Sequence, residues 1–367
     1  MAKYEPSHLK VMNTKLIYQE FLKGESLFVK EISRATGISV PTVMKVIDFL
    51  TENQLIVEQE NVSNRVGRKP IMFGINKDKY YSIGMIYEGD YLHTGIVDLA
   101  GKVVDVVHVK CELEFESYAF ESIDRLIESN KKNIGDLIGI GIGMHGTFQP
   151  ESREILAPLI GFAAPKFFGS FIDDLVGKYQ TKVIMENDAN VQAFGEYSAK
   201  SQDVSKDMIY ITLGSGLGAG MIVDGKVRVG ERNICGEIGY YMLDYEGEKT
   251  EAGWLESQIN LSALREKFKL WGDSENLQGT TEAIDYVATK LALVVNILTL
   301  SYDIEDIVLD GHVIAFLGEE LIWKTQEKVN KICYTPVKIR GKSIEHPGIT
   351  GGGYLVTDMW LEELFQR

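Results

Sequence analysis

The chain contains 367 residues, of which 45% are hydrophobic and 25% are charged, and it is long enough for two or three domains with apolar cores. Its formal net charge of −15 argues against nucleic-acid binding by the whole surface, and three widely spaced cysteines exclude a disulfide scaffold. We find no signal-peptide pattern, and the longest apolar run, residues 291–300, is too short to cross a bilayer. We therefore expect a cytoplasmic protein without a membrane anchor.

The negative charge is unevenly distributed along the chain. Residues 1–76 carry ten Lys and Arg against eight Asp and Glu, whereas the remaining residues carry 28 against 45. A mildly basic N-terminal segment on an acidic body is typical of a protein that meets DNA at one end only.

The first 50 residues predict three helices with a tight turn at Gly37 between the second and the third. The first helix spans about residues 8–22. Ser39 is a suitable N-cap for the third helix, and Pro41 lies in its first turn, where a missing N–H costs no helical bond. The apolar residues that we expect in the core of this unit are Met12, Leu16, Ile17, Ile32, Ala35, Val43, Val46, Ile47 and Leu50.

The start of the third helix and the segment after it carry the residues expected to contact DNA. Small and basic side chains exposed at the start of a recognition helix can enter a major groove. Two extended runs follow, joined by a polar loop containing Gly-Arg-Lys-Pro, which suits a narrow minor groove as the wing of a winged helix. The alternative is a solvated, charged hairpin. The predicted DNA-binding residues are Ser39, Val40, Thr42, Lys45, Arg65, Arg68 and Lys69.

The rest of the chain predicts two similar α/β lobes with a cleft between them. Residues 77–111 alternate extended runs with turn signals, which predicts a three-stranded antiparallel meander, and residues 117–130 predict a helix. The segment LIGIGIGMHGTF predicts a buried strand ending at His145 and Gly146. The segment ITLGSGLGAGMIV then repeats strand, glycine-rich turn and strand, and a further strand ends at Asp310.

A polar cluster in the segment MENDANVQAFGE lies between an apolar run and a helical pattern. It contains Glu186, Asn187, Asp188 and Asn190. Ligands of open α/β sheets bind at the carboxyl ends of strands, which favours a binding site here. The alternative is a helix N-cap, but a cap needs only one of these residues.

Three motifs, MENDANVQAFGE, LGSGLGAGMIVDGKV and CGEIGYYML, follow the expected helix-turn-helix in this order and spacing. In this arrangement the chain resembles the ROK family of sugar kinases and sugar-responsive repressors, in particular its xylose-repressor-like branch. The resemblance covers essentially the whole chain. It implies an N-terminal winged helix-turn-helix followed by a two-lobed, actin-like ATPase body of the α/β class. The implied domains are residues 1–76, a first lobe of residues 77–190 completed by a C-terminal helix over residues 350–367, and a second lobe of residues 191–349.

The resemblance also implies a sugar site. Asp188 corresponds to the catalytic base of the family's kinases, here a vestigial base, and Asn187 to the sugar ligand beside it. Carboxylates suit a sugar because each offers two strong acceptors to neighbouring hydroxyl groups. Any one of these acids could alternatively be a solvated surface residue of an acidic protein. The residues expected to bind sugar are Asn187, Asp188, Glu237, Tyr240, Glu256, His145 and Gly146.

The chain departs from the family pattern where a nucleotide would bind. The first phosphate loop of the kinases is replaced by GMIYEGDY, with Ile86, Glu88 and Asp90 in place of its Asp, Gly and Thr. An acid in a phosphate cradle repels ATP, so we expect no phosphoryl transfer. The glycines of the second loop, which we expect to survive only as a structural turn and vestigial nucleotide loop, are Gly214, Gly216 and Gly218.

The family's structural zinc site is also altered. Tyr240 replaces the family's histidine ligand, and residues 244–254 contain no cysteine, whereas such a site needs about four N or S ligands. We therefore expect neither a metal nor a cofactor. His145, where the family usually has Pro, and Leu159, where it often has Asn, leave the identity of the sugar open.

Together these observations predict a cytoplasmic transcriptional repressor that forms a homodimer or a dimer of dimers. It is expected to bind double-stranded operator DNA and a small sugar or sugar-phosphate effector, with no membrane partner. One alternative is an active ATP-dependent sugar kinase with a DNA-binding appendage. Another is a sugar-independent DNA-binding protein whose body only dimerises or contacts a phosphotransfer protein.

Overall fold

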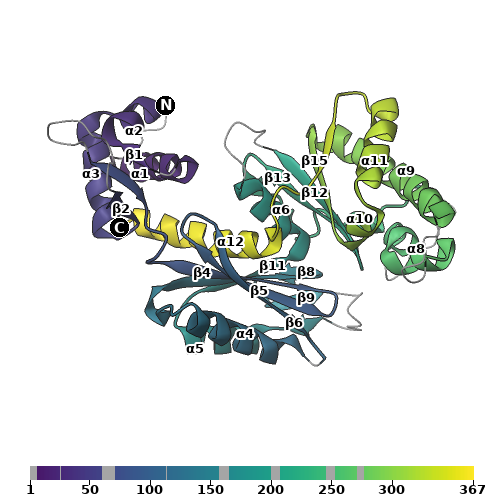
Figure 1. Cartoon of the computed structure of the whole chain (residues 1–367), viewed down its shortest axis with the longest axis horizontal. Coiled ribbons are helices and arrows are strands. Elements are labelled where there is room, and N and C mark those ends of the chain that lie inside the picture. The colour runs from purple at the N-terminus through teal and green to yellow at the C-terminus, as the bar shows by residue number, and fades with distance from the viewer. Residues whose placement is uncertain are drawn as a thin grey trace.

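The structure is a computed structural model, and it describes residues 6–24, 26–59, 71–112, 114–156, 165–199, 207–244, 253–270 and 277–367. Three parts follow one another in space: a small N-terminal module, a first α/β lobe and a second α/β lobe. The long C-terminal helix joins the module to the first lobe (Figure 1).

The N-terminal module consists of three helices and a small antiparallel sheet of strand order β1-β3-β2. Its core is built on Ile17, Ile32, Val43, Ile47 and Leu50, all of which are buried, as the sequence predicts. The elements are α1 (Pro6–Lys23), β1 (Leu27–Phe28), α2 (Val29–Thr36), α3 (Val40–Glu52), β2 (Ile56–Gln59) and β3 (Met72–Ile75).

Three of the apolar residues expected in this core lie outside it. Met12 and Leu16 are 46% and 44% exposed, and Ala35 is also exposed. Together with Leu9, Met12 and Leu16 form a stripe at helical spacing on the outer face of α1, because α1 buries only the face that carries Ile17. Helical periodicity gives the faces of a helix, but it does not say which of two apolar faces is covered.

The first lobe is a five-stranded sheet of order β11-β7-β4-β5-β6. Strands β4, β5 and β6 form the antiparallel meander that the sequence predicts, and β7 and β11 extend the sheet in parallel. Helices α4 and α5 cover one face and α12 covers the other (Figure 1). The elements are β4 (Tyr81–Glu88), β5 (Tyr91–Asp98), β6 (Val103–Lys110), α4 (Phe115–Ser129), η1 (Ile134–Asp136), β7 (Leu137–Met144), α5 (Gly169–Tyr179), β11 (Val183–Asn187) and α12 (Pro347–Phe365). A small antiparallel sheet follows β7 and comprises β8 (Thr147–Gln149), β9 (Glu154–Leu156) and β10 (Lys166–Phe167).

The second lobe repeats the same strand plan in the order β14-β13-β12-β15-β16, with β12, β13 and β14 antiparallel and β15 and β16 added in parallel. Helix α6 packs against strands of both sheets, so it lies between the lobes. The elements are α6 (Asp188–Ser198), β12 (Met208–Leu213), β13 (Leu217–Val223), β14 (Lys226–Val227), η3 (Ile238–Tyr240), α7 (Glu256–Ile259), α8 (Leu261–Phe268), α9 (Leu277–Tyr302), β15 (Asp306–Asp310), α10 (His312–Leu317), α11 (Glu319–Ile332) and β16 (Lys338–Gly341).

Helix α9 contains the apolar run noted in the sequence, and it is longer than that run suggests. Its segment Thr280–Tyr302 is long and apolar enough to cross a membrane, with a mean hydropathy of 1.6. However, 56% of that window is buried inside the protein, where Val287, Leu291 and Leu298 belong to the core of the second lobe. A core helix accounts for this pattern.

Candidate functional site

A cavity of about 960 Å³ opens between the two lobes. Its wall on the first lobe comes from the ends of β4, β7 and β11, and its wall on the second lobe comes from the β12–β13 turn, η3 and α7. Every sugar-binding residue that the sequence predicts lies in this wall: His145, Gly146, Asn187, Asp188, Glu237, Tyr240 and Glu256.

The loop after β7 presents His145 to the cavity. Gly146 has a φ of 100°, a backbone conformation that favours glycine, and this turn ends the strand sharply beneath the cleft. The Nδ1 atom of His145 lies 3.7 Å from Oδ2 of Asp188, which makes the contact an ion pair and not a hydrogen bond. Burial lowers the pKa of His145, but the direct side-chain interaction with Asp188, together with the charges of Asp188, Glu256 and Glu237, outweighs burial and raises that pKa to about 9. The imidazole is therefore a cation at neutral pH.

The polar cluster at the end of β11 provides the N-cap of α6 and part of the cavity wall. Asn187 is the N-cap of α6, where its side-chain oxygen accepts from the backbone N–H of Asn190 at 3.1 Å. Its amide nitrogen donates to the carbonyl of Gly146 at 3.1 Å, which ties the two cleft loops together. Because Asn187 caps the helix, Asp188 is free to face His145 and the cavity, and it is only 9% exposed.

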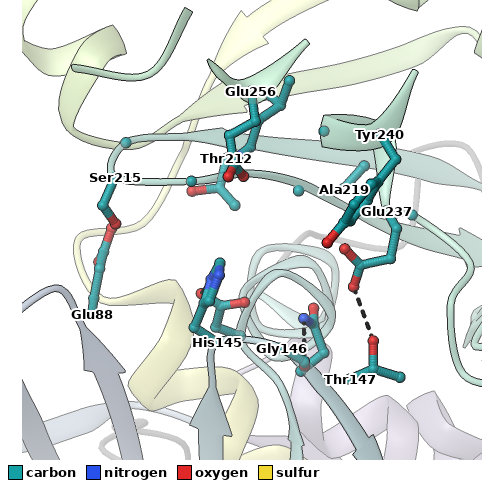
Figure 2. Close-up of a pocket in the computed structure, with 18 of the residues that line it drawn as sticks. Glu88, His145, Gly146, Thr147, Thr212, Ser215, Ala219, Glu237, Tyr240 and Glu256 are labelled. Carbon is teal, nitrogen blue, oxygen red and sulfur yellow. Dashed lines mark hydrogen bonds and ion pairs between the residues drawn. The ribbon is translucent and has the colours of Figure 1, made fainter. Parts of the chain in front are cut away.

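Two glutamates face Asp188 from the second lobe. Glu237 accepts a hydrogen bond from the hydroxyl of Thr147 at 3.2 Å across the cleft (Figure 2). Glu256 is 3% exposed, and its Oε2 accepts from the backbone N–H of Leu217 at 2.7 Å, while its buried Oε1 has no partner. Burial raises the pKa of Glu237, and it raises the pKa of Glu256 to about 7. An acceptor buried without a donor costs free energy, which a hydrogen-bond donor brought to the Oε1 of Glu256 would reduce.

The other end of the cavity is where a nucleotide phosphate would be expected. The β12–β13 turn is closed by a bond from the N–H of Gly214 to the carbonyl of Gly216 at 2.8 Å, and Gly218 lies within β13. A Cβ at Gly216 would lie 2.8 Å from the ring of His145, so this glycine leaves space for the histidine. Glu88, at the end of β4, points toward Ser215 of the turn (Figure 2). Burial raises the pKa of Glu88, because an environment with little solvent disfavours the charged form of a carboxylate.

Two acids of the first lobe line this end of the cavity. The carboxylate of Glu88 faces the β12–β13 turn, and Asp90 lies exposed at the rim (Figure 2). Ile86 is buried against Gly348 of α12 and takes no part in the cavity. The chain thus shows no counterpart of the kinase phosphate loop on β4.

The structure also tests the fit of a structural zinc ion. Cys111, Cys235 and Cys333 lie in different parts of the fold, and Tyr240 is in η3 at the cavity wall. Within the ranges that the structure describes, no group of three or more His, Cys, Asp or Glu side chains could hold a metal ion. Residues 245–252 of the knuckle region and Leu159 lie outside the described residues.

The expected DNA-contacting residues fall into two groups. Ser39, Val40 and Lys45 are exposed at the start of α3, and Thr42 is half-buried there. The hydroxyl of Ser39 lies 2.9 Å from that of Thr42 and makes no bond to the helix backbone, so its cap contribution is smaller than expected. The wing residues Arg65, Arg68 and Lys69 lie outside the described residues.

Among the cleft residues that the sequence did not predict are Thr147 and Ser215. Thr147 donates to Glu237 and begins β8 only two positions after His145, a proximity that was a usable signal. Ser215 lies opposite Glu88 in the glycine-rich turn, of which the sequence predicted only the glycines (Figure 2).

Two lobes of identical strand plan, with acids and a glycine-rich turn facing each other across a cleft, define a two-lobed α/β protein of the actin-like type. A model of the ROK family matches residues 83–358. The chain therefore belongs to the ROK family.

Similar proteins within this family include repressors and kinases. The chain is 27% identical over 256 residues to a xylose repressor from Bacillus subtilis (strain 168). The matched segment covers 68% of this chain and 65% of that relative. It is 25% identical over 358 residues to a xylose repressor from Caldicellulosiruptor bescii, and the matched segment covers 88% of each chain. A glucokinase from Halalkalibacterium halodurans is 30% identical over 176 residues, or 46% of this chain and 52% of the relative.

A solved structure shares the whole fold, including the N-terminal module. The crystal structure of a ROK family transcriptional regulator, a homolog of the E. coli MLC protein, superposes with a TM-score of 0.75. The match covers 98% of both chains at 18% identity, so the likeness establishes the arrangement of elements and nothing finer.

Proposed function

We propose that the protein is a sugar-responsive transcriptional repressor, which binds operator DNA through its N-terminal module and a sugar in the cleft between its lobes without phosphorylating it. The observation that carries this proposal is the unpartnered, buried Oε1 of Glu256, a residue that lines, together with Asp188 and Glu237, a cavity large enough for a small ligand. Relatives along most of the chain are named xylose repressors, which supports the same role.

The charge of the cleft favours an unphosphorylated sugar over a sugar phosphate. The described residues that line the cavity include five acids and no Lys or Arg, with His145 as their cation. Among the neighbouring segments outside the described residues, residues 157–164 contain no charged residue, and residues 245–252 contain three Glu against one Lys. A phosphate group needs Arg, Lys or backbone donors, whereas acids accept from hydroxyl groups.

For the N-terminal module we propose a winged helix-turn-helix with α3 as the recognition helix. The three helices and the sheet order β1-β3-β2 support this assignment. Gln59 pairs with Met72, so the wing is the connection between β2 and β3, which includes Arg65, Arg68 and Lys69. The domain boundaries after residues 76, 190 and 349 are part of the same proposal.

The active-kinase alternative is weakened by Glu88, even though a glucokinase is among the relatives. An acid facing the β12–β13 turn would repel the phosphates of ATP. An assay for sugar-dependent ADP release separates the two functions directly.

We also propose that the repressor acts in the cytoplasm as a homodimer that associates through the outer faces of α9 and α11. Leu293, Ile297 and Leu300 form one stripe on α9, and Leu300 is 62% exposed. Trp323 on α11, which packs against α9, is 64% exposed. A repressor that reads two half-sites needs a second copy, and an isologous apolar face supplies it.

The proposed function is tested by isothermal titration calorimetry with D-xylose, D-glucose, D-xylose 5-phosphate and D-glucose 6-phosphate. We expect at least one free sugar to bind and neither phosphate ester to bind. Tighter binding of an ester than of its parent sugar would contradict the assignment of the cleft.

A further inference from the structure

The tip of α12 is part of the core of the N-terminal module. Leu361, Leu364 and Phe365 pack into the cluster that contains Ile17 and Phe21 of α1. The ring of Phe365 lies edge-on to two aromatic rings of the module, with centroids 5.8 Å from Tyr18 and 6.3 Å from Phe49. The module and α12 therefore share one hydrophobic core, and the module is not tethered by a linker alone.

Two further contacts hold the module against the first lobe. The hydroxyl of Tyr18 donates to the carbonyl of Leu99 at 3.3 Å, and Lys15 of α1 forms an ion pair with Glu362 of α12. Only residues 76–80 join β3 to β4, and Tyr80 among them packs against Trp360 with ring centroids 4.9 Å apart. A change in the direction of α12 must therefore turn the module with it.

At its other end α12 lies in direct backbone contact with α6. A Cβ at Gly195 of α6 would lie 1.9 Å from the carbonyl oxygen of Pro347, and a Cβ at Gly351 of α12 would lie 1.8 Å from that of Val191. Because no side chain separates the two backbones, neither helix can move without displacing the other. The first residue of α6 is Asp188, which lies in the cleft.

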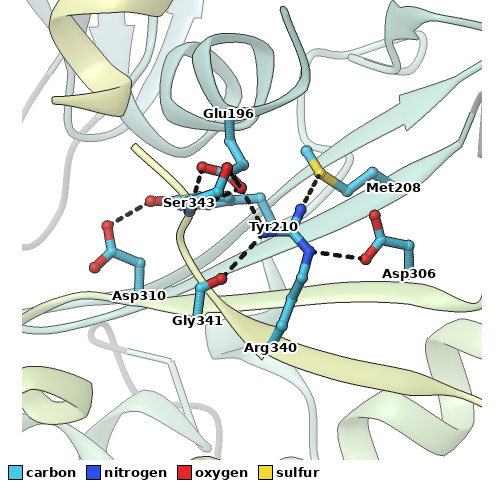
Figure 3. A network of polar contacts seen from close by, with 8 residues as sticks. All are labelled: Glu196, Met208, Tyr210, Asp306, Asp310, Arg340, Gly341 and Ser343. Carbon is cyan, nitrogen blue, oxygen red and sulfur yellow. Dashed lines mark hydrogen bonds and ion pairs between the residues drawn. The ribbon is translucent and has the colours of Figure 1, made fainter. Parts of the chain in front are cut away.

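A buried polar network joins this helix pair to the second lobe (Figure 3). Glu196 of α6 is fully buried and accepts from the backbone N–H of Ser343 at 2.9 Å and from its hydroxyl at 2.7 Å. Arg340 of β16 pairs with Glu196 and donates through Nε to Asp306 of β15 at 3.2 Å. Ser343 lies in the connection between β16 and α12. The network therefore links α6, the second lobe and the segment that leads into α12 at one point.

We infer that α12 is the element through which the cleft controls the N-terminal module. Because α12 is also in direct backbone contact with Gly84 of β4 and Gly141 of β7, closure of the lobes on a ligand moves the first lobe, α6 and α12 as one body relative to the second lobe. The contact of Phe365 with Tyr18 and Phe49 keeps the module on that body, so closure reorients the module relative to the second lobe. The inference rests on the proposed function, since it assumes a ligand in the cleft and DNA on the module. Phe365 acts as a positioning residue that touches neither ligand.

The test measures coupling separately from binding. Full-length protein is titrated with the free sugar of the calorimetric panel that the wild type binds most tightly, and with an operator fragment selected by the wild type from random-sequence duplex DNA. Operator affinity is measured by fluorescence anisotropy with and without saturating sugar. The ratio of the two affinities is the coupling, which we expect to be about 5- to 150-fold in the wild type.

The diagnostic variant is Phe365→Ala, and Gln366→Ala, an exposed neighbour on the same helix end, is its matched control. Phe365→Ala should bind sugar as the wild type does and bind operator in the absence of sugar, but sugar should change its operator affinity by less than about 2-fold. Gln366→Ala should keep the wild-type ratio. If Phe365→Ala fails to bind operator, Phe365→Leu keeps apolar volume while removing the ring contacts, and its ratio should fall below that of the wild type.

A Phe365 variant that binds both ligands with the wild-type ratio overturns the inference and leaves the proposed function intact. A wild-type protein that binds operator but none of the sugars overturns the proposed function and the inference with it. The two failures are thus distinguishable from the wild-type titration alone.

Discussion

The imidazole of His145 lies 3.7 Å from the carboxylate of Asp188, at the floor of the interlobe cleft. Since acids around it raise the pKa of His145 to about 9, Asp188 faces a protonated imidazole at neutral pH. The carboxylate of Asp188 can accept a hydrogen bond from a hydroxyl group of a molecule bound in the cleft.

Replacing Asp188 with Ala should impair the response to sugar and spare DNA binding. The substitution removes an acceptor from a desolvated site, which should weaken sugar binding by about 1 to 3 kcal/mol. The half-maximal sugar concentration for the change in operator binding should rise accordingly in a gel-shift titration. Asp173→Ala, which removes an exposed acid of α5, is the control and should behave as the wild type. A wild-type response from Asp188→Ala would mean that the sugar binds elsewhere.

Replacing Glu256 with Gln should stabilise the unliganded protein at neutral and alkaline pH. Burial raises the pKa of Glu256 from 4.5 to about 7, so the folded state holds a proton that the unfolded chain releases between these values. The wild type therefore loses stability relative to Glu256→Gln as the pH rises from about 4.5 to 7, and the difference is constant above pH 7. The gain at pH 8 is at most about 3 kcal/mol.

The measurement for Glu256→Gln is urea unfolding at pH 5 and pH 8. The amide oxygen of Gln can still accept from the N–H of Leu217, so the substitution tests the charge and keeps that bond. Equal free energies of unfolding for the two proteins at pH 8 would show that Glu256 is not held in an unfavourable environment.

Arg68→Ala should weaken operator binding if the connection between β2 and β3 is a wing. A contact to base edges in a groove should cost about 1 to 3 kcal/mol, whereas a phosphate contact should instead lower the salt slope by about one. Gel-shift titrations at several salt concentrations distinguish these outcomes. No change in either affinity or slope would reject the wing assignment.

The purified protein should contain no stoichiometric zinc and should release no ADP with any hexose. The reasons are Glu88, which faces the β12–β13 turn from the end of β4, and Tyr240, which stands where the family has a histidine ligand. Elemental analysis and a coupled ADP assay check the two expectations independently. One zinc per chain, or sugar-dependent ADP release, would contradict the corresponding expectation.

Ile297→Lys should convert the dimer to a monomer, because a charge placed on the apolar stripe of α9 cannot be buried against its symmetry mate without cost. Light scattering over a concentration series measures the change. Lys290→Ala on the same helix is the control. A wild-type protein that is itself monomeric at micromolar concentration would refute the proposed face.

Local sequence patterns predicted most of the elements, because each strand and helix carries its own periodicity. The meander of β4 to β6 and the strand that ends at His145 were expected from the sequence and are confirmed. The contacts between distant segments could not be predicted in this way. Nothing in the sequence near Gly216 shows that its missing side chain leaves space for His145, and nothing near Phe365 shows that it completes a core with Tyr18.

The ion pair between Lys15 and Glu362 joins residues that are 347 positions apart in the chain. At typical rates of protein synthesis, α1 emerges from the ribosome roughly 20 to 70 seconds before α12 is complete. During that interval the N-terminal module lacks Leu361, Leu364 and Phe365, which complete its hydrophobic core in the finished chain. The module therefore reaches its final packing only after the last turns of the chain have been synthesised.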